Sequence, residues 1–147
     1  MNLLDSLKEN DSVAVKQEAK TWEEAIEVCM APLLENNAVK REYVDAIIDR
    51  TNELGPFYVL APGLAMPHER PEKGVNRDSF SFITLKEPVK FSDGQEVDIL
   101  IGLAATSTDI HNGEAIPQRV MLFEDEDAFE KIRAAQTKED IYKIIEG

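Results

Sequence analysis

The sequence predicts an α/β fold: a single three-layer αβα domain with a mixed central sheet of about five strands, flanked by helices on both faces. Segments in which apolar residues recur at helical spacing alternate with short β-type runs, an order typical of a sheet covered by helices. The 147 residues suit one compact domain, and no Ser/Gly-rich linker or internal repeat divides them. We therefore expect residues 1–147 to form one domain, although the strand order cannot be derived from these patterns.

The N-terminal part predicts a short helix, a short strand and a longer helix. Residues 2–9 fit the first helix and residues 12–15 (SVAV) fit the strand. Thr21 is typical of a helix N-cap, and Glu24 three residues later completes a capping box. The helix is expected to end near residues 36–37. Its apolar face is formed by Trp22, Ala25, Ile26, Cys29 and Leu33.

A second long helix is predicted over residues 41–54, where Gly55-Pro56 ends it. Its buried stripe consists of Tyr43, Val44, Ile47 and Ile48. A β-type run follows at residues 57–61, and Pro62-Gly63 turns the chain towards Pro67-His68. Residues 71–74 read as a loop.

The C-terminal half predicts two more strands and three helices. Residues 79–85 alternate polar and apolar, as a half-buried strand does, and a hairpin or loop follows at 87–94. Residues 97–105 are the most apolar β-type run and are predicted to be the central strand. A polar loop at 106–113 holds His111. The first predicted helix covers 114–123, with Pro117 in its first turn. The second covers 125–134, with Phe129 and Ile132 facing inward. Thr137 and Asp140 mark the start of the last helix, whose buried face consists of Ile141, Ile144 and Ile145.

Charge and composition exclude several classes of function. The net charge of −13 would be repelled by nucleic acids and by anionic membranes, so we expect neither as a partner. The charge serves solubility or steers a partner with a basic docking face, and composition does not separate the two. No apolar run is long enough for a membrane span, and the acidic N-terminal residues do not resemble a signal peptide. The single cysteine, Cys29, forbids an internal disulfide and is expected to be a buried structural thiol. We therefore expect a cytoplasmic protein without direct membrane insertion.

His68 is the candidate reactive residue. It stands in LAPGLAMPHERPEKG (60–74), a Gly/Pro-punctuated loop after an apolar β-type run. A neutral imidazole carries a nitrogen lone pair at pH 7 and can attack phosphorus without a separate base, and the P–N bond it forms is labile. His111, the only other histidine, follows the strongest strand candidate. If the two preceding strands are neighbours, both imidazoles reach one edge of the sheet; otherwise they are unrelated surface residues.

Four further residues could support such a site. Gly63 permits a backbone conformation whose N–H groups could hold a phosphoryl group, and Arg70 could contact the phosphate or a partner. Arg50 could reach the site from the C-terminal end of its helix. Each arginine also has a simpler interpretation: Arg70, like Arg77, as a solvated loop charge, and Arg50 as the partner of a neighbouring acid such as Asp49 or Glu53. Glu69 could orient a ring nitrogen or simply be exposed.

Other chemistries lack their motifs. Two distant histidines and one cysteine do not supply the three or four ligands of a metal site, so no metal is expected. The chain has no G-x-S-x-G nucleophile elbow and no G-x-x-x-x-G-K-[ST] nucleotide loop. We expect no cofactor.

The chain resembles the IIA components of the bacterial phosphoenolpyruvate-dependent sugar phosphotransferase system, in the mannitol/fructose superfamily and its ascorbate-specific branch. The resemblance covers nearly the whole length and rests on LLDSLKENDSV, TWEEAIEV, YVDAIID, GPFYVLAPGLAMPHERPEKGV, FITLKEPVKF, DILIGLAA and LFEDEDAFEKIRAAQTKEDI. APGLAMPH is the most specific segment.

The resemblance implies a phosphocarrier. Phospho-HPr would donate its phosphoryl group to His68, and the cognate IIB component would accept it on a cysteine. The membrane component IIC, reached only indirectly, would then import the sugar, here L-ascorbate. His111 matches the supporting histidine of the family, and Arg50 matches its arginine only loosely because the spacing differs. Glu69 departs from the pattern, since a small residue commonly follows the active histidine. Two alternatives stay open: a regulatory domain of the same fold whose phosphorylation state controls a protein partner, and an interaction module with an inert His68.

Overall fold

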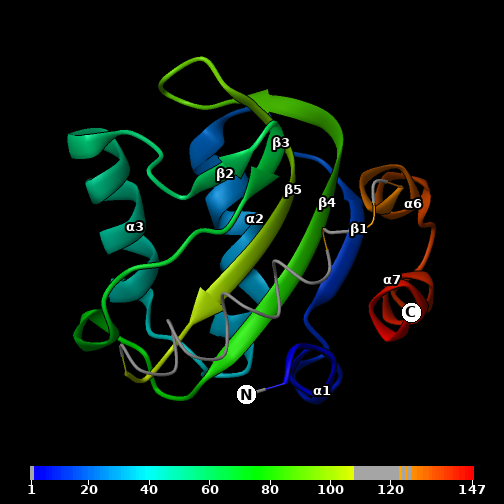
Figure 1. Cartoon of the computed structure of the whole chain (residues 1–147). Coiled ribbons are helices and arrows are strands. Elements are labelled where there is room, and N and C mark those ends of the chain that lie inside the picture. Colours follow the sequence, from blue (N-terminus) through cyan, green and yellow to red (C-terminus); the bar gives the residue numbers. More distant parts are fainter. Residues whose placement is uncertain (1, 108–122, 124, 126) are drawn as a thin grey trace.

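Five strands form one mixed sheet in the order β1-β4-β5-β3-β2 (Figure 1). The structure is a computed structural model that describes residues 2–107, 123, 125 and 127–147. Strands β1 and β4 are parallel, as are β3 and β5, whereas β4–β5 and β2–β3 are antiparallel. The strands are β1 (Val13–Gln17), β2 (Val59–Ala61), β3 (Gly63–Ala65), β4 (Ser79–Lys90) and β5 (Glu96–Ala104). The predicted mixed sheet and the central position of the most apolar strand are confirmed.

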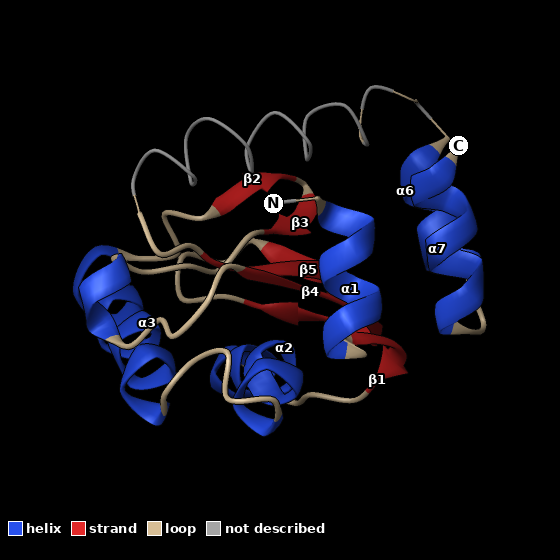
Figure 2. Ribbon diagram, turned by 90° about the horizontal axis from the view of Figure 1, so that it is seen from below, coloured by secondary structure: helices blue, strands red, loops and turns tan. Residues whose placement is uncertain are grey.

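Helices cover both faces of this sheet (Figure 2). One layer holds α2 (Trp22–Glu35) and α3 (Arg41–Leu54), and the other holds α1 (Leu3–Asn10), α6 (Ala128–Ala134) and α7 (Lys138–Glu146). Each layer encloses its own apolar core. The first core includes Ile26, Leu33, Val44 and Ile47, and the second includes Leu3, Leu7, Ile132 and Ile141. The three-layer αβα architecture is therefore as predicted.

Side-chain caps mark the starts of α1, α2 and α7, whereas α3 and α6 begin without one. The Asn2 side chain accepts a hydrogen bond from Asp5 N at 3.0 Å at the start of α1, and the Thr21 side chain does the same for Glu24 N at 3.2 Å at the start of α2. The capping box predicted at Thr21 is only half present, because the Glu24 carboxylate accepts from Lys20 N instead of Thr21 N. The complete reciprocal box occurs before α7, between Thr137 and Asp140.

Strand β4 is more buried than its sequence predicted. Residues 79–85 are all buried, although their alternation indicated one exposed face. Helices lie on both sides of this strand, so its polar side chains find partners inside the protein. The Ser81 hydroxyl donates to the Cys29 carbonyl at 2.7 Å, and Thr84 Oγ1 accepts from Lys16 N at 2.8 Å. Small hydroxyl side chains on a strand thus fit a two-sided core once their hydrogen bonds are satisfied.

Several elements between residues 57 and 90 differ from expectation. The predicted strand at 57–61 is reduced to β2, and the missed strand β3 follows directly after Pro62. Strand β4 continues to Lys90, past the predicted hairpin start, with an irregular register between Thr84 and Val89. The loop expected at 71–74 contains the short 3-10 helix η1 (Pro71–Lys73).

The C-terminal part is described only from residue 123 with gaps. Helix α6 begins at Ala128, three residues later than predicted, and Ile132 is buried as expected. The predicted loop with His111 and the predicted helix at 114–122 lie outside the described residues. Within the described ranges, no helix combines the length and apolarity that crossing a membrane requires.

Candidate functional site

His68 lies immediately beyond β3, where the chain runs beside the end of β5. Met66 N donates to the Tyr58 carbonyl at 2.9 Å, and Leu103 N donates to the Pro67 carbonyl at 3.1 Å. These hydrogen bonds connect Met66 to the segment before β2 and Pro67 to the end of β5. The strand predicted before His68, at residues 57–61, forms β2, which pairs with β3 and is not a neighbour of β5. The unpredicted strand β3 is instead the parallel hydrogen-bonded neighbour of β5, and this pairing brings His68 to the end of the central strand.

The contacts of the His68 ring define which nitrogen carries the proton. Nδ1 lies 2.7 Å from the Met66 carbonyl oxygen. A carbonyl can only accept, so Nδ1 must donate, and the neutral ring then carries its lone pair on Nε2. The ring also meets Phe57 edge to face, with 5.5 Å between centroids and planes 88° apart. The imidazole is thus fixed in orientation and in tautomer.

A cavity of about 250 Å³ adjoins this ring. Helix α3 contributes Arg50, and the end of β5 contributes Ala105. The remaining walls come from the segments before and after the histidine, and the full lining is Arg50, Phe57, His68, Glu69, Arg70, Pro71 and Ala105. The structure therefore brings His68, Arg50 and Arg70 together, as predicted, in a space large enough for a phosphoryl group.

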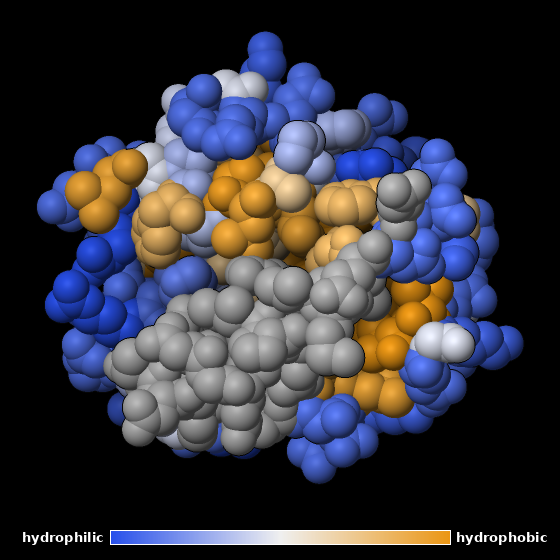
Figure 3. All heavy atoms as spheres, viewed as in Figure 1, coloured by the Kyte–Doolittle hydropathy of each residue, from blue (hydrophilic) through white to orange (hydrophobic). Residues whose placement is uncertain are grey.

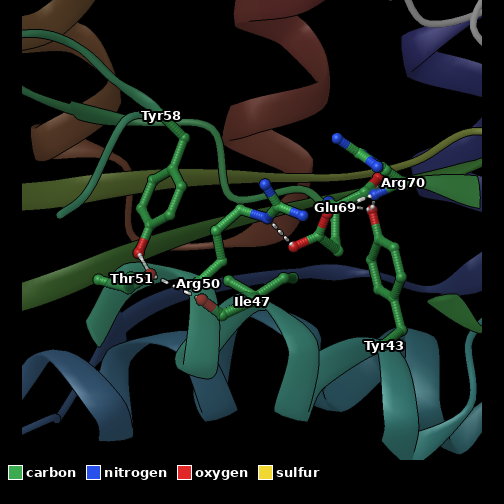
Figure 4. Close-up of polar contacts among 7 residues, drawn as sticks. All are labelled: Tyr43, Ile47, Arg50, Thr51, Tyr58, Glu69 and Arg70. Atoms are coloured by element: carbon green, nitrogen blue, oxygen red, sulfur yellow. Dashed lines mark hydrogen bonds and ion pairs between the residues drawn. The ribbon is translucent and has the colours of Figure 1, made fainter. Parts of the chain in front are cut away.

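Glu69 is buried and paired with Arg50. Its side chain is 3% exposed, and Oε2 accepts from Arg50 Nε at 2.6 Å (Figure 4). The other carboxylate oxygen, Oε1, accepts from Arg70 N at 2.9 Å. The expectation of an exposed Glu69 is wrong, and so is the pairing of Arg50 with Asp49 or Glu53. Burial of a carboxylate requires such a partner, which explains both outcomes.

Tyr43 connects α3 to residues 66–70, the segment after β3 that contains His68 and that we call the histidine loop. Its hydroxyl donates to the Leu103 carbonyl at 2.6 Å and accepts from Glu69 N at 2.9 Å. Burial raises the pKa of this phenol above its ordinary range, so the hydroxyl keeps its proton and continues to donate. Sequence reasoning treated Tyr43 only as a core residue. The available signal was the hydroxyl itself, because a buried tyrosine usually needs a polar partner.

A second link of this kind connects α3 to the segment before β2. The Thr51 hydroxyl donates to the Ile47 carbonyl at 2.7 Å and lies 2.7 Å from the Tyr58 hydroxyl (Figure 4). Tyr58 in turn receives the hydrogen bond from Met66 N through its carbonyl. Helix α3 therefore supports the histidine loop at two places, one on each side of Arg50.

Gly63 and Arg77 lie elsewhere. Gly63 has a φ of 89° and starts β3 against the ion pair between Asp98 and Arg133, and it does not line the His68 cavity. Arg77 donates to the Asn36 carbonyl at 2.8 Å and to Asn10 Oδ1 at 2.6 Å, which ties its loop to α1 and α2. His111 lies outside the described residues.

Part of the exposed surface is apolar. Figure 3 shows hydrophobic atoms gathered over the β2–β3 region. Leu54, Phe57 and Leu60 are the large exposed apolar residues of the described ranges, and Phe57 also lines the His68 cavity. Among the described residues no cluster of three or more His, Cys, Asp or Glu side chains could hold a metal ion.

Comparison with known proteins gives a consistent result. The family described as "Phosphoenolpyruvate-dependent sugar phosphotransferase system, EIIA 2" matches residues 6–147. The ascorbate-specific PTS system EIIA component of Escherichia coli (strain K12) is 44% identical over 148 aligned positions, which cover 99% of this chain and 96% of that protein.

Two solved structures are similar over most of the chain. A crystal structure described as a PTS IIA (PtxA) from Streptococcus mutans has a TM-score of 0.97 and 49% identity, covering 99% of this chain and 94% of that one. The complex of enzyme IIAMTL and phosphorylated enzyme IIBMTL from Escherichia coli contains a chain with a TM-score of 0.78 and 25% identity, covering 93% of this chain and 95% of that one.

Proposed function

This chain belongs to the phosphoenolpyruvate-dependent sugar phosphotransferase system EIIA 2 family, and on that premise we propose that it relays a phosphoryl group through Nε2 of His68. The observation that carries the assignment is the 2.7 Å contact between His68 Nδ1 and the Met66 carbonyl. This contact directs the lone pair of the neutral ring to Nε2. Residues 1–147 would form one IIA domain around this site.

In the transfer step, the Nε2 lone pair attacks the phosphorus of phospho-HPr. The bond from phosphorus to the donor atom breaks, and its electron pair stays with HPr. The proton on Nδ1 remains on the ring, which therefore gains positive charge. The Met66 carbonyl, already hydrogen-bonded to Nδ1, stabilises that charge and keeps the imidazole a good leaving group for the next transfer.

Cationic groups of the cavity would hold the phosphoryl oxygens. The Arg50 guanidinium lines the cavity and is anchored by Glu69, and Arg70 adds a second cation. Planar N–H donors suit the equatorial oxygens of a phosphoryl group in transfer. His111, which lies outside the described residues, would also support the group, whereas Gly63 does not line the cavity and is not part of this proposal.

The partners follow from the family. We propose phospho-HPr as donor and a IIB component, accepting on a cysteine, as the next carrier, with the membrane component IIC served indirectly. Phe57, exposed and part of the cavity wall, offers these proteins an apolar contact, because exposed aromatic residues at a reaction site commonly mark an interface. The relative from Escherichia coli supports L-ascorbate as the sugar. We place the protein in the cytoplasm, where these partners act.

Phosphorylation by purified components tests the proposal. The protein is incubated with phosphoenolpyruvate, the general donor protein and HPr, and phosphorus NMR then identifies the modified nitrogen. We expect an acid-labile phosphoryl group on Nε2, lost in His68→Ala and formed more slowly in His111→Ala. Label on Nδ1, or label retained in His68→Ala, would reassign the acceptor. Onward transfer to an ascorbate IIB component, compared with a mannitol one, tests the sugar and separates transport from regulation.

A further inference from the structure

We propose that Glu69 is a positioning residue of the phosphoryl site, whose buried carboxylate both orients Arg50 and acts as a fixed negative charge that limits the stability of phosphorylated His68. The proposal rests on the proposed function, since it concerns the phosphoryl group on His68.

The carboxylate is fixed at both oxygens. Oε2 accepts a hydrogen bond from Arg50 Nε, and Oε1 accepts one from Arg70 N. The backbone N–H of Glu69 itself donates to the Tyr43 hydroxyl. With its side chain 3% exposed, Glu69 cannot turn out to solvent without breaking these contacts. Its charge therefore stays in the wall of the cavity that His68 also lines.

Glu69 holds Arg50 by one edge only. The hydrogen bond uses Nε of the guanidinium, which carries five N–H donors in a planar fork. In the described part of the chain the four N–H groups on the terminal nitrogens are not engaged by Glu69, so they can serve an anion in the cavity. Figure 4 shows the two terminal nitrogens of Arg50 beyond the Nε contact. A side chain that is 28% exposed would otherwise sample many rotamers, and the ion pair selects one.

Phosphorylation would bring a second anion into this wall. The attraction of Arg50 for the phosphoryl group is opposed by the repulsion from the Glu69 carboxylate, and burial weakens the screening of both. As a result, Arg50 orients the phosphoryl group on His68, while the Glu69 charge keeps the phosphorylated form from becoming too stable to transfer the group. A relay requires this balance, because a group bound too tightly would not be passed on.

The equilibrium between HPr and this protein measures the charge effect directly. The ratio of phosphorylated protein to phospho-HPr is determined at equilibrium for the wild type and for Glu69→Gln, which removes the charge and nearly preserves the size. We expect the ratio to rise on the order of tenfold, as removal of a nearby buried like charge should produce. A purely structural role would not favour the phosphorylated form.

The matched control is Asp98→Asn. It removes a carboxylate that is also largely buried, 13% exposed, and also paired with an arginine, Arg133, but does not line the cavity. We expect its ratio to equal that of the wild type. Glu69→Ala is a second variant, because it removes both the charge and the two hydrogen-bond acceptors. Its ratio should also rise, while the loss of Arg50 anchoring should slow transfer from HPr.

The outcomes separate the two proposals. If Glu69→Gln and Glu69→Ala are phosphorylated on His68 with an unchanged or lower ratio, the charge role of Glu69 is refuted and the relay function stands. If Asp98→Asn raises the ratio as much as Glu69→Gln does, the effect is one of overall charge and the inference also fails. Failure of His68 to become phosphorylated in the wild type would instead refute the proposed function.

Discussion

The Tyr43 hydroxyl, on α3, accepts a hydrogen bond from the backbone N–H of Glu69 at 2.9 Å. The same hydroxyl donates to the Leu103 carbonyl at 2.6 Å, so one buried oxygen joins a helix, the histidine loop and the end of β5. The segment that follows His68 is therefore held by a side chain 26 positions earlier in the chain. Through this contact, the position of the histidine loop depends on the orientation of α3.

We expect Tyr43→Phe to weaken both the fold and the site. The change leaves Glu69 N and the Leu103 carbonyl buried without this partner, which should lower the free energy of unfolding by about 1–3 kcal/mol. Urea denaturation measures the loss, and phosphoryl acceptance from HPr should slow in parallel. Tyr142→Phe is the control, because Tyr142 lies half-buried on α7, away from the histidine loop. Equal losses in the two variants would show that the Tyr43 hydroxyl has no special role.

The ion pair between Arg50 and Glu69 predicts non-additive stability. Arg50→Met should cost about 2 kcal/mol or more in unfolding free energy, because it leaves the buried Glu69 carboxylate without its cation. Adding Glu69→Gln to this variant should recover part of the loss, since no unpaired charge then remains. Chemical denaturation of both single variants and the double variant gives the coupling energy. Simple additivity would mean that the pair is not coupled in the folded state.

Local sequence signals predicted the fold well for helices whose ends are determined by their own capping and terminating residues. The bounds of α3 and the start of α7 follow from helical periodicity and from residues that cap or end helices. The short strand β3 was missed because three residues carry too little pattern. The burial of residues 79–85 was underestimated because only the tertiary structure shows that helices cover both faces of β4.

The site was predicted only in part, because some of its contacts depend on local sequence and others on the tertiary structure. His68 was identified from loop chemistry, and the adjacency of β3 and β5 then placed it beside the end of the central strand. The partner of Arg50 could not be derived from sequence, because Glu69 lies 19 positions away and approaches only through the fold. The half-present box at Thr21 shows a similar limit, since Glu24 had two backbone donors within reach.

Gly63 provides a test of packing at the sheet edge. Gly63 and Gly94 have φ values of 89° and 87°, so alanine is strained at both positions, by about 1–2 kcal/mol. A Cβ at Gly94 meets open space, whereas one at Gly63 would collide with Arg133 Nη2 and approach Asp98 Oδ1 to 3.1 Å. Gly63→Ala should therefore lower the unfolding free energy more than Gly94→Ala, as measured by thermal or urea denaturation. Equal losses of unfolding free energy would show that the ion pair between Asp98 and Arg133 shifts to make room for the added methyl group without an energetic cost.

Cys29 should be unreactive in the folded protein. Its side chain is fully buried, and burial raises the pKa of the thiol to about 12, so almost no thiolate exists at pH 8. A chromogenic disulfide reagent should react rapidly in denaturant and at least a hundredfold more slowly without it, because reaction requires opening of the core. Rapid labelling of the folded protein would contradict the burial of this residue.

Buried phenols and the buried thiol should make the protein sensitive to alkaline pH. Burial raises the pKa of Tyr58 above its ordinary 10.0 and that of Cys29 from 9.0 to about 12, so the folded state keeps protons that the unfolded state releases. The folded state then binds more protons, and the free energy of unfolding falls as pH rises above about 9 for Cys29 and about 10 for Tyr58. Each group contributes a slope of about 1.4 kcal/mol per pH unit within its window. Urea denaturation between pH 10 and 12 should therefore show a shallower decline in Tyr58→Phe than in the wild type, and an identical decline would mean that Tyr58 titrates normally in the folded protein.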